Sequence, residues 1–245
     1  MKLDHLHFGD CLLGMEQVAD RSVHLALCDL PDGRTKFRSK RVAWNGDIDL
    51  EKLWSSLRRV CRPSAAMLFF ASQPFASRLV VSNPQSFRFD FIWRKSRPTN
   101  TINAKTQPMR SHEHILVFAD KPPRYRPQWT DGHKPIVGNV PRKGETTRLA
   151  TSVLDFQSTG LNRTHMVQKP DLLLRHLILS FTRRGDLVLD PTAGSGSTLI
   201  AAKQLGRRFV GFEVDGETVV KARRKIEETK TLELCPRQCE GARVG

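Results

Sequence analysis

The sequence predicts an α/β fold in which a mostly parallel β-sheet carries helices on both faces. Short apolar runs alternate along the 245 residues with segments of helical periodicity, which is typical of repeated βαβ units. Three of the apolar runs end in an acidic residue at the start of a loop, and ligands of α/β sheets bind at such strand ends. With 39% hydrophobic residues, the chain is expected to form one domain with room for an inserted lobe.

Six strands are expected from the apolar runs. They are residues 23–28, 66–71, 87–93, 114–119, 186–190 and 208–213. A helix is expected over residues 50–60, where Leu, Trp and Val recur at helical spacing. Asp47 and Asp49 precede it, and either carboxylate could cap its free N–H groups.

Two further helices are expected in the second half of the chain. Pro170 stands where a first helical turn begins, and an apolar stripe continues from there to Phe181. Another helix follows a small-residue loop, with Ser195 or Ser197 as its cap and Gly206 at its end. We assign these apolar stripes to the core and no chemistry to them.

Residues 120–164 show no periodicity. The segment is rich in Pro, Gly, Asn, Lys and Arg, and it is long for a connection within a compact domain. Its cations lie among Tyr125 and Trp129, a mixture that suits phosphate contacts and insertion into a nucleic-acid groove. A flexible surface loop is the alternative interpretation, and the two are compatible. Residues 34–42 and 94–110 are expected to form two further basic loops.

The composition favours a polyanionic partner. The 40 Lys and Arg residues against 25 Asp and Glu residues give a formal net charge of +15. Charge of this size promotes nucleic-acid binding through counterion release and weighs against an enzyme of small molecules. The sequence has no long apolar run and no signal peptide, so we expect a soluble, cytoplasmic protein without a membrane partner.

The five cysteines are an odd number without a disulfide pattern. Cys11, Cys28 and Cys61 stand in or beside apolar segments, and we expect them to be reduced and packed. Cys235 and Cys239 have no second pair and no histidine nearby, so no metal site is predicted.

The most informative segment is the loop that follows residues 186–190. Gly194 and Gly196 carry no Cβ, so the backbone there can approach a ligand closely. The spacing is not the dinucleotide-binding GxGxxG, because position 199 is Leu, and no GK[ST] follows as in a P-loop. A nucleoside ligand with little negative charge is therefore favoured. Glu213 ends the next strand and could accept hydrogen bonds from ribose hydroxyls, although an ordinary βαβ turn with an exposed Glu is the alternative.

The third acidic strand end carries a family signature. Asp29-Leu-Pro-Asp32 resembles the Asp-Pro-Pro-Tyr motif of amino-group DNA methyltransferases that use S-adenosylmethionine. Other segments resemble motifs of this family in the same order, from about residue 6 to about residue 228. They are Gly9-Asp-Cys11, Leu13-Gly-Met15, Ser22-Val23, Ser72-Gln-Pro-Phe75, Asn103-Ala-Lys105, Met109, His112-Glu-His-Ile-Leu-Val-Phe118, Gln168-Lys-Pro170, the Asp190 loop and Glu213. The catalytic motif precedes the cofactor loop, which is similar to the β group of these enzymes and, most closely, to phage and prophage adenine methyltransferases.

The resemblance implies a Rossmann-like methyltransferase fold with a basic, irregular target-recognition insertion. Residues 1–119 would be the catalytic part, and residues 120–164 the target-recognition region. Residues 165–230 would be the cofactor-binding part of the same domain, and residues 231–245 a flexible tail.

The resemblance also implies S-adenosylmethionine as the cofactor. Asp10 would contact its adenine, Glu213 its ribose, and the Asp190 loop its methionine part. Lys169 and Pro170 would close over it. The implied cofactor residues are Asp10, Cys11, Asp29, Lys169, Pro170, Asp190, Pro191, Thr192, Ala193, Gly194, Ser195, Gly196 and Glu213.

The implied catalytic residues are Asp29, Pro31 and Asp32. An exocyclic amino group is a poor nucleophile because its lone pair is conjugated with the base. The Asp29 carboxylate and the Pro31 carbonyl could accept both amino hydrogens and turn the lone pair towards the methyl-sulfonium. The base must leave the duplex for this reaction. A leading Asp, rather than Ser, favours adenine N6 over cytosine N4 as a tendency of the family.

The implied partner is double-stranded DNA in a bacterial or phage-infected cell, and family members often pair as homodimers. The basic residues expected to contact DNA are Arg34, Lys36, Arg38, Lys40, Arg41, Lys105, Arg110, Arg124 and Arg126.

One position departs from the family signature. Asp32 stands where the family has an aromatic residue that stacks on the flipped base, and such stacking contributes about 1–3 kcal/mol per base. Phe37, Trp44 or Trp93 could supply a substitute ring, although Trp44 could also be a half-buried loop anchor. The alternatives are therefore a weak or inactive DNA-binding pseudo-methyltransferase or partner subunit, and a cytosine-N4, RNA or protein-amide methyltransferase.

Overall fold

The computed structural model describes residues 1–31, 48–131, 147–149, 151–157 and 169–232. Within these residues, eight strands form one sheet in the order β1-β10-β9-β2-β3-β5-β4-β8, and β6 pairs with β7. The strands are β1 (His5–Phe8), β2 (Val23–Cys28), β3 (Cys61–Ala71), β4 (Phe87–Thr99), β5 (Arg110–Phe118), β6 (Trp129–Asp131), β7 (Thr147–Leu149), β8 (Val153–Phe156), β9 (Leu187–Asp190) and β10 (Arg208–Glu213). The helices are α1 (Cys11–Met15), α2 (Leu50–Val60), α3 (Phe75–Ser82), α4 (Asp171–Phe181), α5 (Ser197–Gln204) and α6 (Gly216–Glu228), with a 3-10 turn η1 (Thr101–Asn103).

The main sheet is mostly parallel, as the alternation of elements predicts. β1, β10, β9, β2 and β3 run parallel to one another, β5 is antiparallel to β3 and β4, and β8 is parallel to β4. The six predicted strands are all present. β1 and β8 were not predicted, because a strand of four residues is too short to show a clear alternation.

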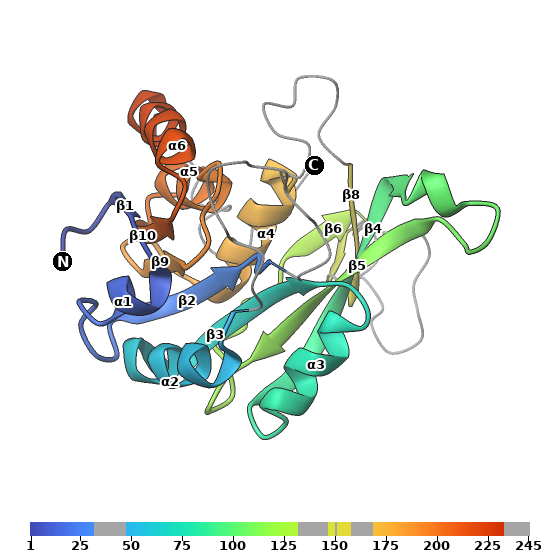
Figure 1. Cartoon of the computed structure of the whole chain (residues 1–245), viewed down its shortest axis with the longest axis horizontal. Helices are drawn as coiled ribbons and strands as arrows, with labels where there is room; N and C mark the ends of the chain where they lie inside the picture. The colour runs from blue at the N-terminus through green and yellow to red at the C-terminus, as the bar shows by residue number, and fades with distance from the viewer. Residues whose placement is uncertain (32–47, 132–146, 150, 158–168, 233–245) are drawn as a thin grey trace.

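Helices cover both faces of the sheet, which confirms the predicted layers (Figure 1). α4, α5 and α6 pack on one face, and α1, α2 and α3 pack on the other. β2 shows the alternation that this requires, since Leu25 and Leu27 join the core under the first group while Ala26 and Cys28 join the core under the second. β2 is therefore an interior strand that is buried on both sides.

The sequence signals at the helix ends are partly confirmed. Asp49 caps α2 by accepting a hydrogen bond from the Lys52 N–H at 3.1 Å, whereas Asp47 lies outside the described residues. Pro170 occupies the capping position of α4, one residue before the predicted first turn. Gly206, with a φ of +70°, follows the end of α5 as predicted.

The predicted serine cap of α5 is wrong. Gly196 stands at the capping position with a φ of +78°, and no side chain caps the helix. The Ser195 and Ser197 hydroxyls hydrogen-bond to each other at 3.0 Å instead. A Cβ at Gly196 would lie 3.3 Å from Ile226 Cδ1, so a glycine here serves both the left-handed turn and the packing of α6.

Two segments are more regular than the sequence predicts. The region 120–164 contains β6, β7 and β8, so it is not without secondary structure. β8 is fixed by pairing with β4, a long-range contact that leaves no mark on the local sequence. Of the basic segment 94–110, only residues 100–109 connect two strands, because β4 continues to Thr99 and β5 begins at Arg110. These strands form a hairpin that projects from the body of the molecule (Figure 1).

The cysteines that the structure describes behave as predicted. Cys11, Cys28 and Cys61 are free and buried, while Cys235 and Cys239 lie outside the described residues. Among the described residues, no cluster of three or more His, Cys, Asp or Glu side chains has the arrangement of a metal site. No described helix combines the length and apolar character needed to span a bilayer.

Candidate active site

Acidic residues stand at the carboxyl ends of four neighbouring parallel strands. Asp10 follows β1, Glu213 ends β10, Asp190 ends β9 and Asp29 follows β2, and these strands are consecutive in the sheet. The carboxyl ends of parallel strands lie side by side along the same end of the sheet. Three steps between strands at about 4.8 Å each make this row roughly 14 Å long, the scale of a nucleoside joined to an amino acid.

The loop of residues 191–196 is tied to this edge by hydrogen bonds. The Thr192 N–H donates to Asp190 Oδ1 at 3.1 Å, and the Thr192 hydroxyl donates to the Asp29 carbonyl at 3.1 Å. The Ala193 N–H donates to the Phe212 carbonyl at 2.9 Å. The loop therefore bridges the ends of β2, β9 and β10 and holds its backbone in a fixed shape beside the acids.

Glu213 is oriented by backbone donors. Its Oε2 accepts a hydrogen bond from the Gly194 N–H at 3.0 Å, and its Oε1 accepts one from the Asp215 N–H at 2.8 Å. A carboxylate offers about four lone-pair sites, so two remain for hydroxyl donors of a ligand. This arrangement suits a ribose diol.

Asp10 caps α1, and Cys11 begins that helix. The Leu12 and Leu13 N–H groups both donate to Asp10 Oδ1, at 2.8 and 3.2 Å, which leaves Oδ2 for a ligand. The Cys11 thiol packs into the core, and burial raises its pKa to about 12. Cys11 can therefore contribute to this edge through its backbone, and its side chain points elsewhere.

Asp190 is the most deeply buried of the four acids, with 4% of its surface exposed. Burial raises the pKa of its carboxyl to about 7, although hydrogen bonds from the Thr198 side chain and the Thr192 N–H favour the charged form. Near neutral pH the carboxyl therefore readily releases its proton to solvent when a cationic ligand binds beside it.

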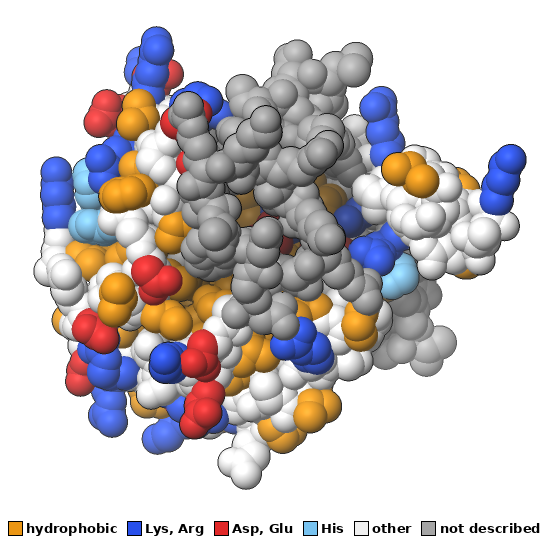
Figure 2. Space-filling view, viewed as in Figure 1, with side chains coloured by type: hydrophobic (Ala, Val, Ile, Leu, Met, Phe, Trp, Pro, Cys, Tyr) orange, Lys and Arg blue, Asp and Glu red, His pale blue; other side chains and the backbone are white. Residues whose placement is uncertain are grey.

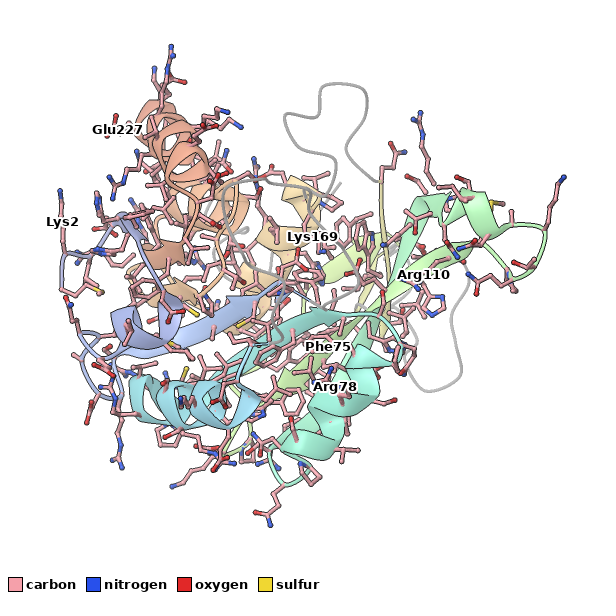
Figure 3. The ribbon with its side chains drawn as sticks, viewed as in Figure 1. Lys2, Phe75, Arg78, Arg110, Lys169 and Glu227 are labelled. Atoms are coloured by element: carbon pink, nitrogen blue, oxygen red, sulfur yellow. The ribbon has the colours of Figure 1, made fainter. Side chains whose placement is uncertain are left out.

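Asp29 forms an ion pair with Lys169, the residue two positions before α4. Lys169 Nζ lies 3.0 Å from Asp29 Oδ1 and 2.9 Å from Oδ2. Desolvation raises the pKa of Asp29, and the Lys169 ammonium opposes that rise. The Asp29 side chain is still 40% exposed, so a substrate can reach it. Lys169 lies at the centre of the molecule, above the strands (Figure 3).

Two further charged residues join this ion pair. Glu113 on β5 forms ion pairs with two lysines. Its Oε1 lies 3.2 Å from Lys169 Nζ, and its Oε2 lies 2.8 Å from Nζ of Lys95, which is on β4. The Lys169 ammonium also lies 4.8 Å from the centre of the Phe70 ring. Sequence reasoning gave Glu113 and Lys95 no role. The available signal was a charged residue next to an apolar strand. It did not reveal the ion pairs, because Glu113 lies far in the sequence from Lys95 and Lys169.

The rest of the predicted catalytic segment is described only in part. Leu30 is buried and Pro31 is half-buried directly after Asp29. Asp32 lies outside the described residues, as do the possible substitute rings Phe37 and Trp44 and the basic residues Arg34, Lys36, Arg38, Lys40 and Arg41.

Trp93 does not qualify as a stacking platform. Its side chain is 4% exposed, and its indole N–H donates to the Phe156 carbonyl at 3.0 Å. The ring is therefore committed to the contact between β4 and β8.

The structure separates the described basic residues into two groups. Lys105 and Arg110 lie on the projecting hairpin, whose lobe displays Lys and Arg side chains (Figure 2). Arg124 and Arg126 lie at the amino ends of the parallel strands, whereas Asp29 lies at their carboxyl ends. The Arg124 N–H donates to the carbonyl of Ser64, near the start of β3, and the Arg126 N–H donates to the carbonyl of Ser180. The cause is that β5 runs antiparallel, so the chain after Phe118 returns to the amino ends of the parallel strands.

Tyr125, which was expected to suit insertion into a nucleic-acid groove, has aromatic neighbours on one side of its ring. Its ring packs against Phe181 at 5.6 Å and near Phe89 and Phe91. One side of the ring therefore lies against core residues beside α4, while 38% of the residue is exposed. Trp129 lies on β6, which pairs with β7.

A family model described as DNA methylase matches residues 43–224. The Type II methyltransferase M2.DpnII of Streptococcus pneumoniae is 48% identical over 63 residues, which span 26% of this chain and 24% of that protein. The DNA adenine methyltransferase YhdJ of Escherichia coli K12 is 25% identical over 241 residues, covering 89% of this chain and 81% of that protein.

Two solved structures have a similar fold. The M1.HpyAVI–SAM complex superposes with a TM-score of 0.63 at 21% identity, covering 91% of this chain and 98% of that one. The cytosine-N4-specific PvuII DNA methyltransferase superposes with a TM-score of 0.67 at 15% identity, covering 97% and 93%. At these identities the likeness concerns the fold alone.

Proposed function

This chain belongs to the DNA methylase family, and from that membership we propose that it transfers a methyl group from S-adenosylmethionine to N6 of adenine in DNA. The observation that carries the proposal is the row of four acids, which ends in the solvent-reachable Asp29. A cofactor bound along this row would present its reactive end beside Asp29.

The residues at the row fit S-adenosylmethionine. Glu213 has lone pairs for two ribose hydroxyls, and Asp10 Oδ2 can accept from the adenine amino group. Asp190 and the loop at 191–196 would hold the methionine part, with Lys169 and Pro170 beside it. When bound, the cofactor supplies an electrophilic methyl group on a sulfonium.

The Asp29 carboxylate and the Pro31 carbonyl would accept hydrogen bonds from the two N–H groups of the target amino group. Transfer of the methyl group from the sulfonium to this nitrogen would make the nitrogen positive, so the two acceptor contacts would strengthen in the transition state. The proton that nitrogen releases passes to Asp29, whose pKa is raised by desolvation. The described cysteines are buried with raised thiol pKa values, so none of them is placed to act as a nucleophile.

The target base must leave the duplex to reach Asp29. A net charge of +15 supports binding to the phosphate backbone, and Lys105 and Arg110 on the hairpin are the described residues that we propose contact it. Arg34, Lys36, Arg38, Lys40 and Arg41 remain part of the proposed interface. We omit Arg124 and Arg126 from it because their backbone lies at the amino ends of the parallel strands, opposite the site.

Adenine is the proposed target because the relative aligned over most of the chain is named a DNA adenine methyltransferase. A homodimer and a bacterial or phage-infected cytoplasm remain predictions from the resemblance. Sedimentation of the purified chain, alone and with duplex DNA, would test the pairing.

Asp32 favours a second candidate function, a DNA-binding chain without turnover, because a carboxylate cannot stack on a base. Tritiated methyl transfer to unmethylated duplex DNA, followed by nucleoside mass spectrometry, separates the two. N6-methyladenine from the unmodified chain supports the proposal, and N4-methylcytosine would correct its target. Methyl transfer only by Asp32→Tyr would identify a methyltransferase scaffold disabled at that position. No methyl transfer by either the unmodified chain or Asp32→Tyr would favour the binding function.

A further inference from the structure

The charged side chains around Asp29 form a continuous chain. Asp29 contacts Lys169, Lys169 contacts Glu113, and Glu113 contacts Lys95, with nitrogen–oxygen distances between 2.8 and 3.2 Å. The side chains of Lys169, Glu113 and Lys95 are 10–13% exposed. Glu113 and Lys95 lie on the two paired strands β5 and β4, whereas Asp29 follows β2 and Lys169 precedes α4, so the chain of contacts joins three separate parts of the fold.

We propose that Glu113 is a positioning residue that holds Lys169 and, through Lys169, orients the Asp29 carboxylate for the amino group of the target base. This inference rests on the proposed function for its substrate. Glu113 itself does not touch the reacting atoms in this assignment.

The geometry of Lys169 gives the first reason. An ammonium has three donors, and Lys169 directs them between both oxygens of Asp29 and Oε1 of Glu113, while the Phe70 ring supports it at 4.8 Å. Held in this way, it uses only part of the lone-pair capacity of Asp29. Without Glu113 the flexible lysine would turn wholly towards Asp29 and compete with the target amino group.

Lys95 has the corresponding role for Glu113. Its ammonium lies 2.8 Å from Glu113 Oε2 and 5.1 Å from the centre of the Trp93 ring. Trp93 is itself fixed by β8, as its indole bond to Phe156 indicates. The orientation of Asp29 is thus linked, through Lys169, Glu113, Lys95 and Trp93, to β8, the outermost strand of the sheet.

The charge balance gives the second reason. Among the described residues, the charged groups near Asp29 are Lys169, Glu113, Lys95 and Asp190. The negative charge of Glu113 raises the pKa of Asp29, whereas the positive charge of Lys95 lowers it. Removing either charge alone should therefore move the titration of Asp29, and the two removals should move it in opposite directions.

The test compares Glu113→Gln and Lys95→Gln, which keep the approximate size of each side chain. The matched control is Glu228→Gln, which removes a charge from the exposed Arg224–Glu228 pair on α6, far from the site. Two measurements are made on each chain. One is the pH profile of kcat, and the other is the titration of the Asp29 carboxyl carbon by ¹³C NMR with labelled aspartate, assigned by its loss in Asp29→Asn.

We expect the Asp29 titration and the acid limb of kcat to move roughly one pH unit down in Glu113→Gln and up in Lys95→Gln. We also expect the plateau kcat of Glu113→Gln to fall on the order of tenfold to a hundredfold, as for a small misplacement of a reacting group. Glu228→Gln should match the unmodified chain in both measurements.

A structural role alone would lower activity without shifting the two variants in opposite directions, and that outcome would overturn the inference. An unchanged plateau kcat in Glu113→Gln would overturn it as well. If the unmodified chain transfers no methyl group, the proposed function fails. The NMR titrations then still decide whether Glu113 sets the pKa of the Asp29 carboxyl.

Discussion

Protonation of Asp190 should control the affinity for the cofactor. The perturbation is a change from pH 7.0 to pH 5.5, made in the unmodified chain and in Asp190→Asn. Burial raises the pKa of Asp190 to about 7, so the carboxyl gains its proton across this range. The α-ammonium of the methionine part keeps its charge here, because α-amino groups titrate near pH 7.7–8.0. Only the protein side of the contact therefore changes its charge.

The magnitude follows from the ionised fraction of Asp190. With a pKa of about 7, the carboxylate is about half populated at pH 7.0 and roughly 3% populated at pH 5.5. If the ammonium binds only the carboxylate, the apparent Kd scales inversely with this fraction. The Kd should then weaken about 16-fold on acidification, equivalent to about 1.6 kcal/mol.

Isothermal titration calorimetry with S-adenosylmethionine at constant ionic strength measures this change. Asp190→Asn should bind more weakly at pH 7.0 and should lose most of the dependence on pH, because it has no proton to exchange. An equal pH dependence in both chains would refute the reasoning and would assign the effect to another group.

Three further predictions concern catalysis, stability and DNA binding. Asp29→Ala should reduce methyl transfer at least a thousandfold in a tritium assay, through loss of the acceptor, while calorimetry should show cofactor binding partly retained. Burial lowers the pKa of His176 to about 4, so its contribution to stability is complete above pH 6.5 and is lost as pH falls towards 4. Between pH 7.5 and 5 this loss is about 2 kcal/mol by urea unfolding, and His176→Leu should lack it; an identical loss in both chains would contradict the assignment. Lys105→Ala and Arg110→Ala should each lower the slope of log K against log salt by about 1 in fluorescence anisotropy with duplex DNA, and unchanged slopes would remove the hairpin from the interface.

The strand ends were predictable because each signal is local. An apolar run followed at once by an acid identifies a strand and the residue at its carboxyl end, and this is how Asp29, Asp190 and Glu213 were found. The layers were predictable for a related reason, since alternating strands and helices leave few other arrangements.

The partners of Asp29 were not fully predictable because they depend on the order of the strands. Glu113 reaches Lys169 only because β5 lies beside β3 and runs antiparallel to it. That direction also carries the backbone of Arg124 to the amino ends of the parallel strands, so a basic residue that looked suitable in sequence lies opposite the site. The cap of α5 was missed because a backbone turn at Gly196 replaces a side chain that sequence rules expect.

The position of β2 has a consequence for synthesis of the protein. β2 pairs with β3 on one side, which follows soon after it in the chain, and with β9 on the other, which is translated more than 150 residues later. Until then β2 is an edge strand whose apolar residues and backbone N–H groups lack their final neighbours, a form prone to pairing with other chains. A nascent chain that has not yet reached β9 and β10 also lacks Asp190 and Glu213. The ribosome must therefore complete most of the protein before any of it can acquire the full site, and a fragment that stops before β9 should be both inert and prone to aggregation.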